Sequence, residues 1–293
     1  MFANIVKYSI YRFGVDSHLP GCMMKRLIVC ADDFALNEAA SRGIAALASA
    51  GRISATSAMV LSPRWAGDAA LLHAVRGQID VGLHLDWTSG FARAAGHGVS
   101  LGGAMLQAML GGFDQKAARA VIERQFDAFE AVWKSPPDHI DGHQHVQQFA
   151  GIRQALVAAV AQRYPPKNRP YLRLSTGSAA ESNIKTKIIA AMGASRLARL
   201  ATAAGIACAP ALSGIYDFSG GAQRYADLMD HWLQGAPEGC IVMCHPATQA
   251  EADDDIGAAR AREYLYLASD DFAQAVTCPG VVICRGGQIN FPA

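Results

Sequence analysis

One short segment, from His139 to His145, carries three histidines and an aspartate at alternating positions. In an extended strand, side chains two residues apart point to the same side. A strand running this whole length would place His139, Asp141, His143 and His145 on one face. Imidazole and carboxylate groups are the ligands that Zn²⁺, Mn²⁺ and Mg²⁺ use in proteins. The segment therefore predicts a divalent metal site, with a polar strand end of solvated imidazoles as the alternative.

Three other apolar runs, of the kind that buried parallel strands need, also stop at an acid or a histidine. The residues at their ends are Asp32 and Asp33, His84, and His245. The alternative for the two aspartates is a loop or capping residue, and either histidine taken alone would more often be a hydrogen-bonded core residue. Four predicted strands that all end in acid or imidazole point instead to one shared site.

The elements that must position these residues alternate along the chain. Short apolar runs predict strands, and stretches with apolar residues at helical spacing predict helices between them, the first capped by Asn37. Residues 185–204 are expected to form one long helix, and the Gly-rich stretch 89–112 a substrate loop. This order predicts a single-domain α/β fold, a distorted TIM-like (β/α) barrel, with an open doubly wound sheet as the alternative. Both place their chemistry at the carboxyl ends of strands.

Composition limits the classes of protein that need to be considered. The chain has 293 residues, 51% of them hydrophobic and 17% charged, with a formal net charge of +1. The hydrophobic fraction is ample for a core. The net charge offers no electrostatic argument for binding to nucleic acid or to an anionic membrane surface. No run of eighteen apolar residues predicts a transmembrane helix.

The seven cysteines are odd in number, lack zinc-finger spacing and lie mostly in apolar runs, so we expect reduced thiols and a cytoplasmic location. Residues 1–23 lack the apolar centre of a secretory signal. We expect them to be an N-terminal extension, either disordered or an artefact of the assigned start site, ahead of a barrel domain over residues 24–293.

The chain resembles the YdjC-like carbohydrate deacetylases, the family of ChbG and HpnK, over about residues 25–284. Four motifs carry the resemblance, each weak alone but specific in combination: ADDF at 31–34, HLDWT at 84–88, HIDGHQH at 139–145 and HP at 245–246. The resemblance implies a distorted barrel that removes the acetyl group from an N-acetylated sugar or oligosaccharide and releases acetate. It also implies one divalent metal ion, with Mg²⁺ or Zn²⁺ favoured.

By motif position, the resemblance implies that Asp33, His84 and His143 bind the metal. Asp32 would be the general base and His245 the general acid. Further residues are expected either to orient these groups or to contact substrate: His139, Asp141, His145, Arg173 and Trp87. The alternative for the first three is ordinary hydrogen bonding at a polar strand end, and for Trp87 and nearby Phe91 it is covering of the barrel mouth.

Some positions depart from the family pattern and leave the substrate open. Ala35 and Ala247 stand where the family usually has glycine, and Gln144 and Gln147 where it has further histidines. The expected partner is an N-acetylated carbohydrate, and a homodimer is expected by analogy. Two rival functions remain: a phosphoesterase, whose sites usually hold two or three metals, and a sugar-binding protein that binds without turnover.

Overall fold

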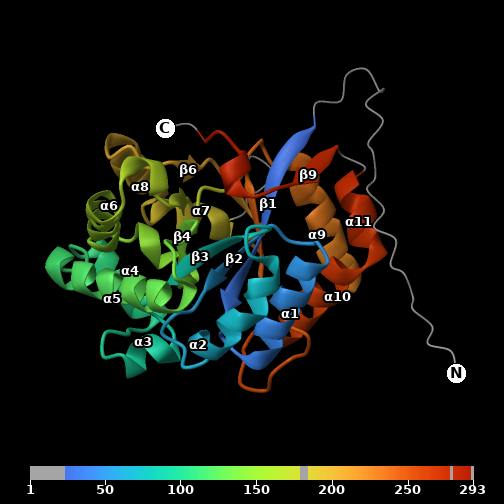
Figure 1. Ribbon diagram of the computed structural model, residues 1–293, viewed down its shortest axis with the longest axis horizontal. Helices are drawn as coiled ribbons and strands as arrows, with labels where there is room; N and C mark the ends of the chain where they lie inside the picture. The colour runs from blue at the N-terminus through green and yellow to red at the C-terminus, as the bar shows by residue number, and fades with distance from the viewer. Residues whose placement is uncertain (1–23, 179–183, 278–279, 292–293) are drawn as a thin grey trace, which may run out of the picture.

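A barrel of parallel strands surrounded by helices forms the body of the protein (Figure 1). The computed structural model describes residues 24–178, 184–277 and 280–291, so the expectation for residues 1–23 lies outside the described residues. The strands are β1 (Lys25–Phe34), β2 (Ala55–Ala58), β3 (Asp80–Leu85), β4 (His139–Gly142), β5 (Tyr171–Arg173), β6 (Cys208–Ala209), β7 (Leu212–Ser213), β8 (Ile241–Cys244) and β9 (Val281–Ile283).

The strand order is β6-β5-β4-β3-β2-β1-β8-β7, and the pairs are parallel. β9 pairs with the first residues of β1. The segment that follows β5 contacts β7, the last strand in this order. Gly177 forms a β-bridge with Leu212 of β7, and the Leu212 N–H donates a hydrogen bond to the Thr176 carbonyl at 2.8 Å. This contact nearly closes the sheet, so the predicted distorted barrel is confirmed in place of the open doubly wound sheet.

Helices connect the strands on the outside of the barrel. The α-helices are α1 (Glu38–Ser49), α2 (Trp65–Asp68), α3 (Gly90–Ala94), α4 (Leu101–Met109), α5 (Gln115–Trp133), α6 (Ile152–Arg163), α7 (Ile184–Ala191), α8 (Ala194–Ala203), α9 (Ala222–Gly235), α10 (Gly257–Ala268) and α11 (Asp270–Thr277). The 3₁₀ helices are η1 (Ala69–Val75), η2 (His143–Gln148), η3 (Pro166–Asn168) and η4 (Gly286–Gln288).

Three local predictions can be compared with these elements. Asn37 caps α1 as predicted, and its side chain accepts a hydrogen bond from the Ala40 N–H at 2.8 Å. The prediction of a single helix over 185–204 is wrong, because the helix is interrupted between α7 and α8. Gly193 lies at this interruption with a φ of 136°, which only glycine adopts readily. Residues 89–112 are not an irregular loop, since they contain α3 and α4.

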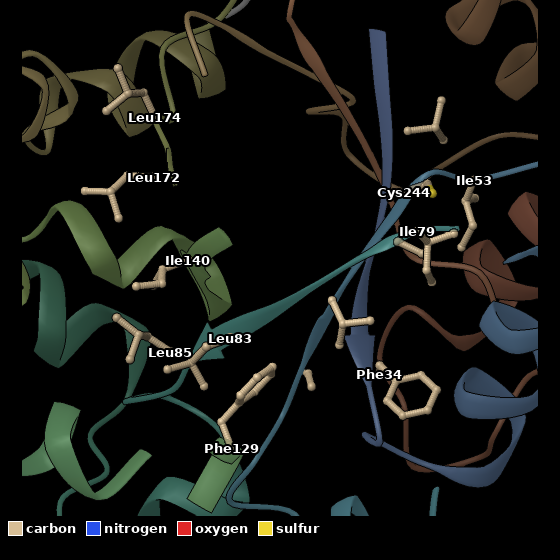
Figure 2. Packing of buried hydrophobic residues seen from close by; sticks show 14 of the residues in the cluster. Phe34, Ile53, Ile79, Leu83, Leu85, Phe129, Ile140, Leu172, Leu174 and Cys244 are labelled. Atoms are coloured by element: carbon tan, nitrogen blue, oxygen red, sulfur yellow. The ribbon is translucent and has the colours of Figure 1, made fainter. Parts of the chain in front are cut away.

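Side chains of the strands alternate between the helix layer and the barrel interior. Leu83, Leu85 and Ile140 belong to the cluster between strands and helices, and Figure 2 shows them near Phe129 of α5. Figure 2 also shows Leu172 and Leu174 beyond them. A second buried cluster takes the alternate positions and fills the lower half of the barrel interior, the half that lies beneath the carboxyl ends of the strands. It includes Ile28, Cys30, Tyr171, Leu212, Ile241 and Met243. The polar residues stand above this cluster, at the carboxyl ends of the strands.

Candidate metal centre at the barrel mouth

A pocket of about 850 Å³ opens over the carboxyl ends of the strands. The sequence-predicted residues that line it are Asp32, Asp33, His84, His143, His145, Arg173 and His245. They come from five strands or the turns that follow them, because parallel strands bring their carboxyl ends to the same rim of a barrel. The pocket therefore brings together residues that lie more than two hundred positions apart in the sequence.

Asp33, His84 and His143 form the group with the clearest metal-binding character. Asp33 Oδ1 lies 3.3 Å from His84 Nε2 and 3.1 Å from His143 Nδ1, and the three ligand atoms lie within 4.8 Å of one another. One carboxylate oxygen and two imidazole nitrogens are a donor set that Zn²⁺, Mn²⁺ and Mg²⁺ accept. The residues present thus fit a single divalent cation.

The His84 ring is held in one orientation by its second nitrogen. Asp141 Oδ1 lies 2.6 Å from His84 Nδ1, and Ser57 Oγ lies 3.0 Å from the same atom. Nε2 therefore faces Asp33, an arrangement that is common among histidines that bind metals. Burial alone would lower the pKa of His84, but the Asp141 carboxylate raises it to about 10. The carboxylates that favour an imidazolium here also favour a metal cation.

His143 reaches this group from outside the strand. The alternation predicted through His145 stops at Gly142, where β4 ends and η2 begins. Gln144 and His145 then take left-handed φ angles of 54° and 62°, a conformation that costs energy for residues other than glycine. The expected common face of four residues is thus wrong, since a tight turn and not the strand directs His143 toward Asp33.

Asp33 itself sits on a tight backbone turn and has a fixed second partner. Its φ is 67°, and Ala35 follows at 71°, a conformation that accounts for a glycine preference at position 35. Arg260 Nη2 of α10 donates to Asp33 Oδ2 at 2.7 Å, while its Nε donates to Asp254 at 2.6 Å. Burial alone would raise the pKa of Asp33, but Arg260 and then His143 hold it well below its usual range.

Asp32 occupies a separate arrangement beside the metal group. Arg173 Nη1 and Nη2 donate to its two oxygens at 2.7 and 2.8 Å, and Arg173 Nη1 also lies 2.9 Å from Asp141 Oδ2. His245 Nε2 stands 3.9 Å from Asp32 Oδ2. Burial lowers the pKa of His245. A buried arginine thus links the carboxylate beside the metal group to the carboxylate that orients His84.

Among the residues that the structure describes, two other groups of potential ligands overlap with this arrangement: Asp32 with His84 and Asp141, and Cys30 with His139 and Asp141. In both, the carboxylates are already paired with Arg173. A fixed cation next to these oxygens opposes a second metal ion. Asp33 Oδ1, which faces both imidazoles, is better placed for a cation than these oxygens.

The remaining predicted residues lie at different depths. His139 is fully buried below the pocket, stacked on Tyr171 with ring centroids 5.3 Å apart. His145 lines the pocket, and Ser175 Oγ lies 3.0 Å from its Nδ1. Trp87 is only 2% exposed and packs on His97 and Phe113, outside the pocket lining, which fits the covering role. Phe91 does line the pocket.

Two residues of α10 that interact with the site were not predicted from the sequence. Arg260 binds Asp33, as described above. Glu263 is fully buried, and its carboxylate accepts hydrogen bonds from the His245 N–H at 2.5 Å and the Tyr216 hydroxyl at 2.6 Å. A charged pair three residues apart on an amphipathic helix is ordinary on a surface, so only their burial marks them as part of the site.

The fold and the site together define an α/β-barrel protein with an Asp-His-His candidate metal centre at the barrel mouth. The chain belongs to the YdjC-like protein family, whose model matches residues 26–277. The resemblance found in the four motifs is thereby confirmed.

Similar proteins agree with this assignment. Chitooligosaccharide deacetylases from Yersinia pestis (strain Pestoides F) and Yersinia pseudotuberculosis serotype O:3 (strain YPIII) are each 37% identical over 146 residues. That alignment covers 48% of this chain and 57% of each relative, so the match spans little more than half of their length. A solved structure from Enterococcus faecalis V583, provisionally described as a cellobiose-phosphate cleavage protein, superposes with a TM-score of 0.65. It is 20% identical and covers 91% of this chain and 99% of its own, which shows a shared fold.

Proposed function

We propose that this protein is a metal-dependent carbohydrate N-deacetylase, which hydrolyses the acetamide of an N-acetylated sugar to acetate and a free amine. The observation that carries the proposal is one pocket that contains the Asp33, His84 and His143 group together with Asp32 and His245. The family and the names of the Yersinia relatives support a carbohydrate deacetylase.

Asp33, His84 and His143 would hold the cation, with Mg²⁺ or Zn²⁺ favoured by this mixed oxygen and nitrogen donor set. When bound, a divalent cation supplies Lewis acidity that makes water more acidic and polarises a carbonyl. Asp141 keeps His84 Nε2 directed at the group through the 2.6 Å contact with Nδ1. Arg260 occupies Asp33 Oδ2 and leaves Oδ1 facing the two imidazoles.

Asp32 is proposed as the general base that takes a proton from the attacking water. The two hydrogen bonds from Arg173 fix the plane of its carboxylate, so one geometry is held before the substrate arrives. Arg173 also pairs with Asp141, which couples the position of the base to the orientation of His84. A carbon–oxygen bond to the acetyl carbonyl carbon forms in this step.

His245 is proposed as the general acid. As the carbon–nitrogen bond breaks, the protonated ring gives its proton to the departing amine, and the acetyl group leaves as acetate. The Glu263 and Asp32 carboxylates partly offset the effect of burial on the pKa of His245 and so favour the protonated ring. The Glu263 hydrogen bond to the His245 N–H holds the backbone of this residue at the end of β8. His139 and His145 are proposed to support the arrangement, and Phe91, which lines the pocket, is proposed as a wall against the sugar.

Acetate release tests the proposal directly. The full chain is treated with a chelator and assayed on N-acetylated mono- and oligosaccharides, with and without each divalent metal added back. Release that the metal restores supports the deacetylase assignment. Tight sugar binding without release from any substrate would instead favour the sugar-binding alternative, and phosphate release from sugar phosphates with two or more metals per chain would favour the phosphoesterase.

None of the described helices is both long enough and apolar enough to cross a bilayer. The cysteines of the described segments are buried thiols: Cys30, Cys208, Cys240, Cys244 and Cys284. Because these thiols are free, we propose that the protein works in the reducing cytoplasm. The homodimer and the domain boundary at residue 24 were predicted from the sequence, and both stay predictions.

A further inference from the structure

One histidine of the pocket has no defined part in the proposed chemistry. His145 lines the pocket together with His84, His143 and His245. The proposed reaction uses the other three, His84 and His143 for the metal and His245 as the acid. The His145 ring is close enough to His84 and to His245 for these groups to act on it electrostatically. It therefore lies next to both the metal group and the proposed acid, where the acetamide would bind.

The backbone of His145 has a conformation that residues other than glycine seldom adopt. His145 and Gln144 both have left-handed φ angles, of 62° and 54°. Such backbone strain persists only where the surrounding structure holds it, and it is concentrated at functional sites. The turn that brings His143 to Asp33 therefore also fixes the position of His145.

A chain of hydrogen bonds determines which ring nitrogen of His145 carries the hydrogen. Gln147 Nε2 donates to the Arg173 carbonyl at 3.2 Å, which sets the orientation of the Gln147 amide because a carbonyl can only accept. The same nitrogen donates to Ser175 Oγ at 3.3 Å. Ser175 is fully buried, and the acceptor that the described residues offer to its hydroxyl hydrogen is His145 Nδ1, 3.0 Å away. Nδ1 therefore accepts, and the hydrogen of the neutral ring is on Nε2.

A fixed N–H donor suits an oxygen on which negative charge develops. In amide hydrolysis this is the acetyl oxygen, which receives the carbonyl π electrons when water attacks the carbonyl carbon. The two arginines of the pocket already donate to carboxylates, Arg173 to Asp32 and Arg260 to Asp33. The Nε2–H of His145 carries no such bond among the described residues. A donor that is oriented before the reaction stabilises the transition state without any cost of reorganisation.

We propose that His145 is a further catalytic residue, whose Nε2–H donates a hydrogen bond to the acetyl oxygen of the substrate as that oxygen becomes an oxyanion. His145 transfers no proton, since the proton of the water goes to Asp32 and the departing amine takes its proton from His245. Ser175 and Gln147 are positioning residues, because they act through the His145 ring. The proposal rests on the deacetylase function proposed above.

The test uses the metal-loaded full chain and the N-acetylated sugar that gives the fastest acetate release with the wild type. His145→Asn keeps an amide near the position of Nδ1 but has no donor at Nε2, whereas the longer side chain in His145→Gln carries an amide N–H to the position of Nε2. We expect His145→Asn to lower kcat by about 10²–10³-fold, the usual effect of losing one such donor, with KM changed by less than about threefold. His145→Gln should recover about tenfold of that loss.

Ser175→Ala tests the hydrogen-bond chain. Without the hydroxyl, the ring hydrogen is free to move to Nδ1, so kcat should fall by about tenfold, a smaller loss than that of the donor itself. His145→Asn combined with Ser175→Ala should have the kcat of His145→Asn alone, because the serine acts through the ring. Ser178→Ala is the matched control and should keep the wild-type kcat. Ser178 is also buried, its Oγ accepts from Ser213 Oγ at 2.9 Å, and it does not line the pocket.

Three results would overturn the inference while acetate release by the wild type leaves the deacetylase function standing. A wild-type kcat with a raised KM in His145→Asn would place the ring against a sugar hydroxyl. Loss of metal affinity in the same variant, measured by calorimetry, would show that the residue only holds the metal-binding turn. Equally low kcat in His145→Asn and His145→Gln would contradict a donor at Nε2. Absence of acetate release by the wild type from every sugar would instead overturn the deacetylase function itself.

Discussion

The lower and upper halves of the barrel interior differ in chemistry although the same strands build both. In the lower half, inward positions carry apolar side chains such as Ile28 of β1 and Ile241 of β8. A few residues further along the same strands, the inward positions carry Asp32 and then His245. The comparison shows that depth along a strand, and not the choice of strand, separates the supporting core from the chemistry.

The two halves also hold their side chains in different ways. The lower half excludes water from an apolar cluster, which stabilises the fold in proportion to the area buried. The upper half buries charges in alternating series, Asp141 with Arg173 and Asp32, and Asp33 with Arg260 and Asp254. Such pairs fix geometry, and breaking one leaves an uncompensated charge. Substitutions in the upper half should therefore lower activity, with or without a loss of stability, whereas those in the lower half should lower stability alone.

Removal of a proposed metal ligand should have the largest effect. In His143→Ala we expect loss of metal binding in calorimetry and loss of acetate release to background, because one of two imidazole donors is gone. His73→Ala, on η1 in the outer layer, is the matched control and should retain both. Metal binding at full affinity in His143→Ala would remove this residue from the ligand set.

Asp32→Asn should lower kcat by about 10²–10⁴-fold, the usual contribution of a general base, while the metal stays bound. The amide keeps a hydrogen-bond acceptor for Arg173 but cannot take a proton at neutral pH. Asp230→Asn, an exposed carboxylate on α9, serves as the control. Turnover at the wild-type rate would refute the assignment of Asp32 as the base.

Asp141→Asn should weaken metal affinity by about 10–100-fold, the effect typical of groups that orient a metal-binding histidine. The variant loses the charge that faces His84 Nδ1 at 2.6 Å and leaves Arg173 with one carboxylate partner. Calorimetric titration of the metal measures the change. Unchanged affinity would show that Ser57 alone suffices to orient the ring.

Metal affinity should rise with pH across the neutral range. The pKa of His84 is about 10 without metal, so a proton occupies the ring below that pH and must leave when the metal binds. Affinity should then increase by about tenfold per pH unit for this one proton, and Asp141→Asn, which lowers the pKa of His84, should flatten the dependence. Binding that weakens as pH rises would contradict His84 as a ligand.

The smallest effect is expected in the lower half. Ile241→Val should lower the free energy of unfolding by about 0.5–1.5 kcal/mol, the usual cost of one buried methylene, with kcat and KM unchanged. Denaturant unfolding measures the stability, and acetate release measures the activity. A fall in kcat in a variant that keeps its stability would break the separation between the two halves.

Much of the site follows from local sequence patterns. Apolar runs that stop at Asp32, His84 and His245 identified strand ends, and parallel strands in a barrel must bring those ends together. The Asn37 cap and the strands that carry these residues were likewise predicted, because a capping oxygen or an apolar run acts within a few residues. Such local signals do not depend on the rest of the fold.

Long-range packing determined what the sequence left open. Arg260 and Glu263 lie on one turn of α10 and look like surface charges. Only the packing of α10 against its neighbours α1 and α9 brings them to Asp33 and His245. The end of β4 at Gly142 also depends on its neighbours, because a strand continues only where β3 and β5 offer hydrogen-bond partners.

The sequence by itself determined the chemical groups of the site, the strands that carry them and the family to which the chain belongs. Tertiary structure alone decided which oxygen faces which nitrogen, which arginine neutralises each aspartate, and which ring nitrogen of His145 faces Ser175. The physical reason is the distance along the chain over which each interaction acts. Capping and strand patterning act between near neighbours, whereas ion pairing and burial depend on distances that only the closed barrel sets.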